Sequence, residues 1–481
     1  MWWLVIACGG KLEETPEGSG ETACDGKDDD GDGAVDEGLT QERYPDEDGD
    51  GYGVTNDMFT YDGCVNEEGW AAVNGDCDDK DELVNPDAEE ICGDDVDDDC
   101  DGVPDACNEL DSDYAVARYY GDGYALDGSG LAVVADADGT GGAGFVAIGV
   151  SEKGTDAVLA WSGVGTGRMY GGDAALPYDD VQRVAALDGG IAVGTEASGL
   201  GRVDVRFGPV TGASTGGFAR VGDGAPEDVG FAVGGGDWLG EPSVAWAYDG
   251  ESWGVGIDPL TLTGELSAAD IATTVAIDSA PTAILPFPGT DGADDLLVVT
   301  GGATLFEGPF SGATALEDAA ATFSTSSGGS ASAVVADFDG DGASDVALGD
   351  PAYDVVTVWL APTAGEHPAA EAEVRLDGPS GSQAGQQVST ADDLDGDGLP
   401  ELLVYGPIAP GGVWIVTAPW KGNVTTDAAW RRLGDASASY GNGVTAGDLD
   451  NDGLPEVVLG GSDGAQGFLD LYLGSAIVAG P

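Results

Sequence analysis

Aspartates spaced two residues apart are the clearest chemical pattern in this sequence. Within residues 334–350, carboxylates stand at Asp337, Asp339, Asp341 and Asp345, with glycines between them and apolar runs on both sides. Two carboxylates about 4 Å apart repel each other by roughly 4 kcal/mol at an effective dielectric constant of about 20. Several carboxylates in one tight turn therefore indicate that a cation lies among them.

The same spacing, D-x-D-x-D-G-x-x-[DE], occurs five times, and it suits calcium, which takes roughly six to eight oxygen ligands. Acids at positions 1, 3, 5 and 9 and the carbonyl at position 7 could supply these oxygens, while the glycine at position 6 permits the turn. The predicted ligands in the C-terminal part are Asp337, Asp339, Asp341, Ala343, Asp345, Asp393, Asp395, Asp397, Leu399, Glu401, Asp448, Asp450, Asp452, Leu454 and Glu456. In the N-terminal part they are Asp28, Asp30, Asp32, Asp36, Asp97, Asp99, Asp101 and Asp105.

A related stretch at 46–57 fits the twelve-residue form of such a loop, with Asp46, Asp48, Asp50 and Asp57 as candidate ligands. No helical pattern flanks it, so we do not interpret it as an EF-hand. The alternative for all these stretches is a set of solvated hairpin turns. Five copies that each carry an acid at position 9 favour bound calcium instead.

Composition limits the classes of partner and of fold. The 481 residues include 15 basic and 90 acidic ones, which gives a formal net charge of −75. Such a surface repels nucleic acids and anionic lipids, so we expect direct binding to neither. The hydrophobic content of 42% is too high for disorder throughout, and 83 glycines indicate many tight turns. Short apolar runs bounded by Gly and Asp predict an all-β protein.

All seven cysteines lie within the first 107 residues. The even set that follows the first cysteine predicts disulfides and therefore an oxidising compartment, with a thiolate metal site as the alternative. These disulfide candidates are Cys24, Cys64, Cys77, Cys92, Cys100 and Cys107. Six cysteines allow about 15 pairings, so the connectivity stays open.

The first cysteine, Cys8, ends the stretch Val5-Ile6-Ala7-Cys8. This stretch resembles the lipobox of bacterial lipoproteins, in which the cysteine is acylated. The resemblance implies an exported protein, either held at the outer membrane or cell surface by lipid or released outside the cell. The basic residues that usually precede a lipobox are missing, which leaves the true start of the chain open. No apolar run reaches the roughly 18–20 residues of a membrane span, so lipid is the only anchor we expect.

Internal repeats begin near residue 113. Seven acidic or Gly-rich turns each follow an apolar strand, and the best-defined of them start at Asp337, Asp393 and Asp448, at intervals of 56 and 55 residues. Four short strands per unit of roughly 50 residues predict a seven-bladed β-propeller. The last unit lacks its fourth strand, and we expect residues 114–120 to supply it and so hide two sheet edges.

The calcium pattern weakens toward the start of the repeats. The first unit keeps Asp136 and Asp138 but has Thr140 at the third ligand position, and the fourth unit keeps only Asp291 and Asp295. We therefore expect strong sites only in units five to seven.

These patterns divide the chain into four parts. They are a lipoprotein-type signal at 1–8, a linker at 9–23, a Cys/Asp-rich metal-binding region at 24–112 and the propeller at 113–481. The Cys/Asp-rich region has too few apolar residues to bury a core of ordinary size. Disulfides and bound ions are expected to hold it together, and disorder is the alternative.

Residues 113–481 resemble FG-GAP repeats, the units of the integrin α-chain N-terminal β-propeller and its bacterial relatives. The resemblance rests on "DFDGDGASDVALG", "DLDGDGLPELLVYG" and "DLDNDGLPEVVLG". In that family the loops of the later blades bind calcium, which agrees with the gradient described above. The resemblance implies a propeller that serves as a ligand-binding platform.

Residues 24–107 resemble a metal-binding motif of secreted bacterial proteins that is akin to thrombospondin type 3 repeats. The resemblance rests on "CDGKDDDGDGAVDEG", "DEDGDGYG", "GDCDDKD" and "DDDCDGVPD". One branch of that family is a copper-binding surface protein. Copper prefers His, Met or Cys ligands, and the chain has one His and three Met, so calcium is favoured.

The sequence gives little support to catalysis. The single histidine, His367, precedes Pro368 in a turn-like stretch where a surface role is the simpler interpretation. The good carboxylate clusters are accounted for as metal loops, and a glycosidase that uses two carboxylates remains the enzymatic alternative. We therefore do not expect an enzyme.

The expected function is a surface-anchored adhesion or recognition protein that binds several Ca²⁺ ions and an extracellular protein or glycan. One alternative is a spacer or envelope scaffold stiffened by calcium, with no ligand of its own. The other is a lectin-like glycan binder, which exposed indole rings at Trp238 or Trp253 would favour. Burial of these rings between blades is the competing interpretation.

Overall fold

The computed structural model describes residues 40–54, 59–62, 69–81, 84–86, 88, 100, 109–110, 114–121, 124–126, 130–138, 141–151, 156–178, 180–195, 201–211, 216–222, 228–250, 252–289, 292–329, 332–408, 412–417, 420, 422–425, 429, 431–434, 440–462 and 467–479. The chain divides into two compact units, Met1–Cys107 and Asn108–Pro481.

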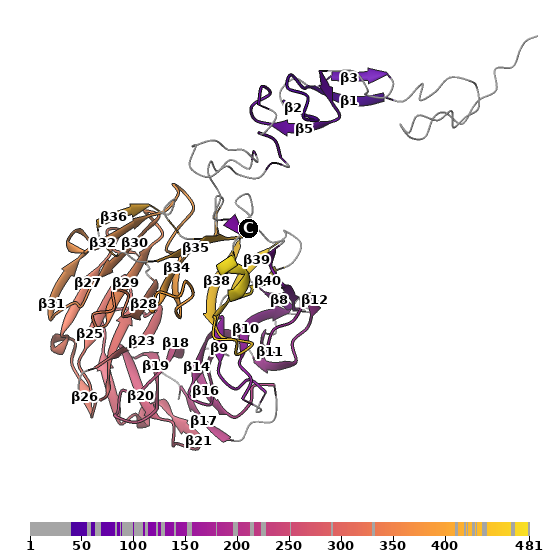
Figure 1. Ribbon diagram of the computed structural model, residues 1–481. Coiled ribbons are helices and arrows are strands. Elements are labelled where there is room, and N and C mark those ends of the chain that lie inside the picture. The colour runs from indigo at the N-terminus through magenta and orange to yellow at the C-terminus, as the bar shows by residue number, and fades with distance from the viewer. Residues whose placement is uncertain are drawn as a thin grey trace, which may run out of the picture. The chain divides into compact units, whose positions relative to one another are not determined.

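Asn108–Pro481 forms a seven-bladed β-propeller, which confirms the predicted fold class. The blades follow one another around a ring (Figure 1), and their innermost strands contact each other all the way round, including the last with the first. The innermost strands are β9 (Ala132–Val134), β14 (Val181–Leu187), β18 (Asp228–Gly236), β23 (Ala283–Pro288), β28 (Ser332–Ala336), β33 (Gln387–Ala391) and β38 (Tyr440–Gly447).

From the innermost strand, each blade runs outward through antiparallel neighbours. Blade one continues with β10 (Gly144–Ser151), β11 (Asp156–Ser162) and β13 (Ala174–Tyr178), and β8 (Tyr124–Leu126) also pairs with β10. Blade two continues with β15 (Gly190–Thr195), β16 (Arg202–Phe207) and β17 (Gly216–Val221). Blade three continues with β19 (Ser243–Asp249), β20 (Trp253–Pro259) and β22 (Thr273–Ala276). Blade four continues with β24 (Asp294–Val299), β25 (Gly302–Phe306) and β27 (Ala321–Ser324).

The last three blades have the same layout and carry the acidic loops. Blade five continues with β29 (Asp345–Asp350), β30 (Val355–Trp359) and β32 (Val374–Asp377). Blade six continues with β34 (Glu401–Gly406), β35 (Gly412–Val416) and β37 (Arg431–Leu433). Blade seven continues with β39 (Glu456–Ser462), β40 (Gly467–Tyr472) and β7 (Ala117–Tyr120).

The ring is closed by strand β7, as predicted from the missing fourth strand of the last unit. It pairs antiparallel with β40, so the chain's early residues complete its final blade. Arg118 of β7 forms two 2.6 Å hydrogen bonds with the carboxylate of Asp470 on β40. The Asp470 side chain is fully buried, and the guanidinium of Arg118 lies 3.8 Å from the ring centre of Phe468.

A fifth strand on most blades was not predicted. In six blades of the described structure, the fourth strand pairs in parallel with a short strand contributed from elsewhere in the chain. These outer strands are β21 (Gly264–Ser267), β26 (Ala313–Thr314), β31 (Gly365–Pro368), β36 (Gly422–Thr425), β6 (Glu109–Leu110) and β12 (Gly167–Tyr170), on blades two to seven in that order. Each covers an edge that would otherwise expose unpaired backbone groups. This pairing also joins neighbouring blades.

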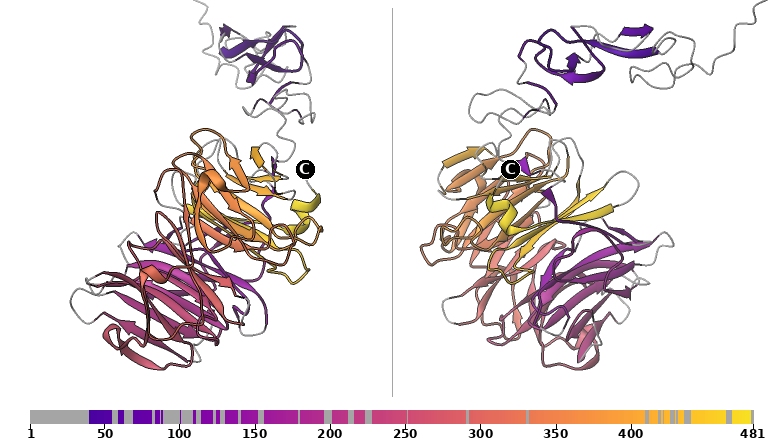
Figure 2. Two further views of the ribbon diagram at one scale, coloured as in Figure 1. Left: turned by 90° about the vertical axis from the view of Figure 1, so that its left-hand side faces the viewer. Right: turned by 45° about the vertical axis from the view of Figure 1, so that its right-hand side comes forward.

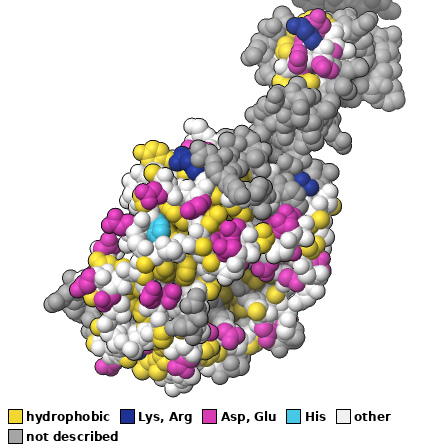
Figure 3. Space-filling model, turned by 60° about the vertical axis from the view of Figure 1, so that its left-hand side comes forward, with side chains coloured by type: hydrophobic (Ala, Val, Ile, Leu, Met, Phe, Trp, Pro, Cys, Tyr) yellow, Lys and Arg dark blue, Asp and Glu magenta, His cyan; other side chains and the backbone are white. Residues whose placement is uncertain are grey.

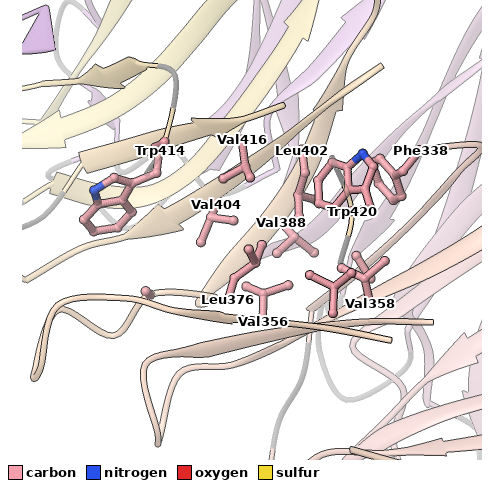
Figure 4. Packing of buried hydrophobic residues seen from close by; sticks show 14 residues of the cluster. Phe338, Val356, Val358, Leu376, Val388, Leu402, Val404, Trp414, Val416 and Trp420 are labelled. Atoms are coloured by element: carbon pink, nitrogen blue, oxygen red, sulfur yellow. The ribbon is translucent and has the colours of Figure 1, made fainter. Parts of the chain in front are cut away.

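The core lies between the faces of neighbouring blades, which pack against each other (Figure 2). In blades five and six the second and third strands are covered on both faces, so they are largely apolar without alternation, and every residue of β30 and β35 is buried. Figure 4 shows one such layer, where Val356 and Val358 of blade five meet Leu402 and Val404 of blade six. Full burial of one such side chain contributes roughly 1.5–3 kcal/mol.

Helical structure is minor in the described residues of the propeller. Three short 3-10 turns occur at Ala268–Asp270, Leu316–Asp318 and Ala369–Glu371. One α-helix, α1 (Gly474–Ala479), follows β40, with Ile477 buried in the core of blades six and seven. No described helix has the length and apolar character needed to cross a membrane.

The described part of Met1–Cys107 contains two small sheets. Strand β1 (Thr40–Pro45) pairs antiparallel with β3 (Phe59–Asp62) and β4 (Trp70–Ala71), and β2 (Tyr52–Val54) pairs in parallel with β5 (Val73–Asp76). A disulfide joins Cys77 to Cys100, two of the six predicted cysteines. The other predicted positions, Cys8, Cys24, Cys64, Cys92 and Cys107, lie outside the described residues.

Candidate metal centres

The three acidic loops of the last blades occupy one structural position. Each connects the innermost strand of its blade to the second strand: β28 to β29, β33 to β34, and β38 to β39. Because the seven blades share one strand direction, these loops leave the same face of the propeller in three successive blades.

Hydrogen bonds inside each loop turn the carboxylates toward a common centre. In blade five, Asp337 accepts bonds from the backbone N–H groups of Gly340 and Gly342 at 2.8 and 2.9 Å. Asp339 accepts from Asp341 at 3.1 Å, and Asp341 from Ala343 at 2.8 Å. The loops of blades six and seven repeat this pattern from Asp393 and Asp448 onward.

The tight turn requires left-handed backbone at two positions. Gly340 and Gly342 have φ values of 74° and 86° in blade five. In blade seven, Asn451 takes the first of these positions with φ of 61°. Asparagine is one of the few residues that tolerates this region without the freedom of glycine.

The acid at position 9 lies at the start of the second strand and is buried. Asp345, Glu401 and Glu456 are each exposed by 1% or less. Each accepts a 2.7 Å hydrogen bond from the backbone N–H at position 2 of its own loop. This acid therefore joins the beginning of the loop to its end.

Burial places these three carboxylates where charge is costly. Desolvation, reinforced by the neighbouring aspartates, raises the pKa of Asp345 to about 6 and that of Glu401 to about 8. The same causes raise the pKa of Glu456. A cation in the loop would offset both the desolvation and the repulsion.

In blades five to seven, the structure brings most of the predicted acidic ligands together. In blade six, ligand oxygens of Asp393, Asp395, Asp397 and Glu401 all lie within 4.8 Å of one another. In blade five the corresponding group is Asp337, Asp339 and Asp345, and in blade seven it is Asp448, Asp450 and Glu456. The predicted ligands Asp341 and Asp452 fall outside these two groups. The carbonyls of Ala343, Leu399 and Leu454 remain predictions as ligands.

The buried apolar residue at position 2 of each loop was not identified from the sequence. Position 2 carries an apolar side chain that is buried under the loop: Phe338, Leu394 and Leu449 are exposed by 2% or less. Ala137 of blade one, at the equivalent position, is also fully buried. The signal that could have revealed this role is an apolar residue between the first two aspartates of each repeat.

The weaker loops have different contacts. In blade one, Asp136 accepts a 2.9 Å bond from Gly141, and Thr140 lies outside the described residues. In blade four, Asp295 accepts a 2.7 Å bond from Gly308, and Asp291 lies outside the described residues. Neither blade contributes an acidic group to the described clusters.

The N-terminal unit holds a fourth cluster. Asp46, Asp48 and Asp50, all predicted ligands, bring oxygens within 4.8 Å of one another in the loop between β1 and β2. Predicted Asp57 lies outside the described residues, as do Asp28, Asp30, Asp32, Asp36, Asp97, Asp99, Asp101 and Asp105.

The other residues considered for function are packed into the blades. The indole of Trp238 is fully buried and donates a 3.1 Å bond to the carbonyl of Asp295, so it offers no surface for a sugar. Trp253 is half-buried against Phe231, with 5.2 Å between ring centres. His367 stacks on Phe323 at 5.0 Å.

The fold and the acidic loops define the class: a seven-bladed β-propeller with FG-GAP-like repeats, preceded by a metal-binding motif region. Residues 393–459, which include the loops of blades six and seven, match the FG-GAP-like repeat. Residues 18–37 and 76–106 match a metal-binding motif of the copper-binding MopE type.

Comparisons with whole proteins give distant similarity alone. No curated protein matches the chain. One similar solved structure is BBS1N in complex with ARL6DN, soaked with mercury. Its sequence is 11% identical, the match covers 73% of this chain and 92% of that chain, and the TM-score is 0.44. The same complex soaked with lead has 10% identity, coverage of 73% and 93%, and a TM-score of 0.45.

Proposed function

We propose that this chain is a calcium-binding, surface-anchored bacterial adhesion or recognition protein with the propeller as its ligand-binding platform. The observation that carries the proposal is the recurrence of one all-oxygen loop at the same position in three successive blades. A propeller with FG-GAP-like repeats and a metal-binding motif suits a role in binding or recognition.

Calcium is the cation that these donors fit best. The described clusters consist of Asp and Glu alone, and hard carboxylate oxygens suit calcium, magnesium or manganese rather than copper. Calcium accepts irregular loops with many protein oxygens, whereas magnesium keeps several waters in a strict octahedron. Loops in which three or four carboxylates converge therefore favour calcium.

The face opposite the acidic loops is the proposed ligand surface. The loops between second and third strands open there, and two of them expose apolar side chains: Tyr353 is 59% exposed and Ile408 is 42% exposed. Both loops are fixed to the segment that follows β32. Asp354 accepts bonds from Gly381 and Gln383 at 2.7 and 2.6 Å, and Ile408 donates its N–H to the Ser382 carbonyl at 3.1 Å.

One further support for the proposal comes from the sequence and another from the packing of the blades. The stretch ending at Cys8 has the form of a lipobox, which supports export and a lipid anchor at the cell surface. The single histidine packs against Phe323, and the described acidic clusters suit a cation, so the proposal assigns binding rather than catalysis to this chain.

A binding array tests the proposal directly. Calcium-loaded protein is applied to glycans and to bacterial and host surface proteins, and Tyr353→Ser and Ile408→Ser are compared with it. Loss of a contact residue at the centre of a binding surface lowers affinity by about tenfold or more. Tyr170→Ser is the matched control, since Tyr170 is 62% exposed on the outer strand β12.

The outcome separates the alternatives. Binding that falls with Tyr353→Ser or Ile408→Ser but not with Tyr170→Ser supports a recognition surface on this face. Selective binding to glycans would identify the lectin-like variant. Folded, calcium-loaded protein that binds no probe would contradict the recognition role and favour a calcium-stiffened scaffold.

A further inference from the structure

The loop between β1 and β2 has the internal geometry of the propeller loops. Asp46 accepts bonds from Gly49 and Gly51 at 2.6 and 3.2 Å. Asp48 accepts from Asp50 at 3.2 Å, and Asp50 accepts from Tyr52 at 2.7 Å. The two glycines have φ values of 88° and 101°. The first seven positions are therefore built as in blades five to seven.

The acid that closes the propeller loops is missing here. Counting from Asp46, position 9 is Val54, whose side chain has no ligand atom. The pairing of β2 with β5 places Asp76 directly opposite Val54. A carboxylate from a neighbouring strand thus stands beside the position where the propeller loops use their own.

The Asp76 carboxylate lacks a partner for one of its oxygens. Its side chain is 5% exposed, and its Oδ1 accepts a 2.8 Å bond from the N–H of Asp78. Its Oδ2 is buried without a hydrogen-bond partner, as are the Oδ2 atoms of Asp48 and Asp50. Three buried, unpartnered carboxylate oxygens in one small unit are costly unless a cation binds them.

Two further interactions link Asp76 and the residues after it to the loop. The carboxylates of Asp48, Asp50 and Asp79 lie close enough to Asp76 to interact with it electrostatically. Asp79 also accepts a 2.7 Å bond from the backbone N–H of Glu47, inside the loop.

We propose that Asp76 of β5 completes a calcium site with Asp46, Asp48 and Asp50, so that one ion joins two separate segments. This site goes beyond the propeller loops and does not depend on them. A two-stranded sheet is marginally stable by itself, and the ion would hold β2 against β5. The disulfide at Cys77 anchors the next residue, so ion and disulfide would act on adjacent positions.

Hydrogen exchange followed by mass spectrometry on the full chain tests this site, with calcium alone as the probe. We expect backbone protection to rise in peptides covering residues 46–54 and 73–79 at one common calcium concentration. Peptides covering 337–345, 393–401 and 448–456 report the propeller loops separately. Protection of the propeller peptides alone in the wild-type chain would overturn this site while leaving the proposed function intact.

Two variants identify the ligand. Asp76→Asn should raise the calcium midpoint of both N-terminal peptides by about tenfold or more, because affinity in such loops follows the number of charged ligands. Glu47→Gln is the matched control, since it removes one charge from an exposed side chain of the same loop, and its midpoint should stay near that of the wild type. An unchanged midpoint in Asp76→Asn, or an equal shift in both variants, would contradict the assignment. If Asp76→Asn loses protection even without calcium, the test is whether the wild-type peptides covering 46–54 and 73–79 gain protection at the same calcium concentration.

Discussion

Asp345, Glu401 and Glu456 are carboxylates buried beneath clusters of like charge. Each raises the free energy of the metal-free fold, because burial and neighbouring aspartates oppose its ionisation. Each also stands where it can close a site for a divalent ion. The same side chain is therefore expected to destabilise the empty loop and to stabilise the filled one.

Glu401→Gln separates these two effects. The amide keeps an oxygen for the N–H of Leu394 but removes the charge, so the metal-free protein should melt at a higher temperature than wild type. With saturating calcium it should melt at a lower temperature. Differential scanning calorimetry with EGTA and with calcium measures both. The control is Asp392→Asn, at an exposed position just before the loop, which should change neither melting temperature. If Glu401→Gln shifts the melting temperature in the same direction with EGTA and with calcium, this account is contradicted.

The metal-free protein should become more stable as pH falls from about 8 to about 5. The pKa values of Asp345 and Glu401 are about 6 and about 8 in the fold, above the roughly 4 of unfolded chains. The folded state therefore binds more protons in this window, and proton uptake favours it. The Asp345→Asn/Glu401→Gln double variant should show a smaller pH dependence in the same chelated buffers. Equal slopes would exclude these two residues as its source.

At the scale of secondary-structure elements, closure of the ring depends on strand β7. Arg118→Ala would leave the fully buried carboxylate of Asp470 without its guanidinium partner. Breaking a buried pair in this way costs about 3–5 kcal/mol. Urea unfolding measures the loss.

Arg375→Ala is a suitable control for that experiment. Arg375 pairs with Asp377 at 2.6 Å, but both side chains are more than a third exposed. An exposed pair contributes about 1 kcal/mol or less. Equal losses in the two variants would show that β7 does not lock the ring as described.

The strands of the blades could be predicted, whereas their outer partners could not. The repeat is local: an acidic loop, a glycine and an apolar run follow one another within a few residues, so seven blades and the closing role of residues 114–120 follow from spacing. Strand β31, "GEHP", is short and polar, and it is a strand because the edge of β27 lies beside it. Burial of Trp238 between blades likewise depends on contacts that local sequence does not specify.

The candidate metal sites likewise differ in whether their ligands are close together in the sequence. The loops of blades five to seven carry their ligands within nine residues, and the spacing identifies Asp393 and Glu401 as partners. Asp76 lies 30 residues after Asp46, and strands β2, β3 and β4 come between Asp46 and the strand of Asp76. Only the pairing of β2 with β5 brings these two acids close, so the sequence offered no reason to connect them.

At the scale of the whole molecule, the net charge of −75 works against a compact fold. On the face that Figure 3 shows, acidic side chains are spread over the propeller, with few basic ones between them. Bound divalent ions at the crowded loops would remove part of this repulsion. When the free calcium concentration is about 100 times the dissociation constant of a site, binding at that site adds roughly 2.7 kcal/mol to the free energy of unfolding.

Thermal unfolding of the full chain with EGTA, followed by calcium in excess, tests this account most directly. We predict that chelation lowers the melting temperature of the propeller by several degrees or more and that calcium restores it. Titration calorimetry on the stripped protein should show binding at the propeller loops. A melting temperature that does not change, together with no calcium uptake, would contradict the central role given to the acidic loops.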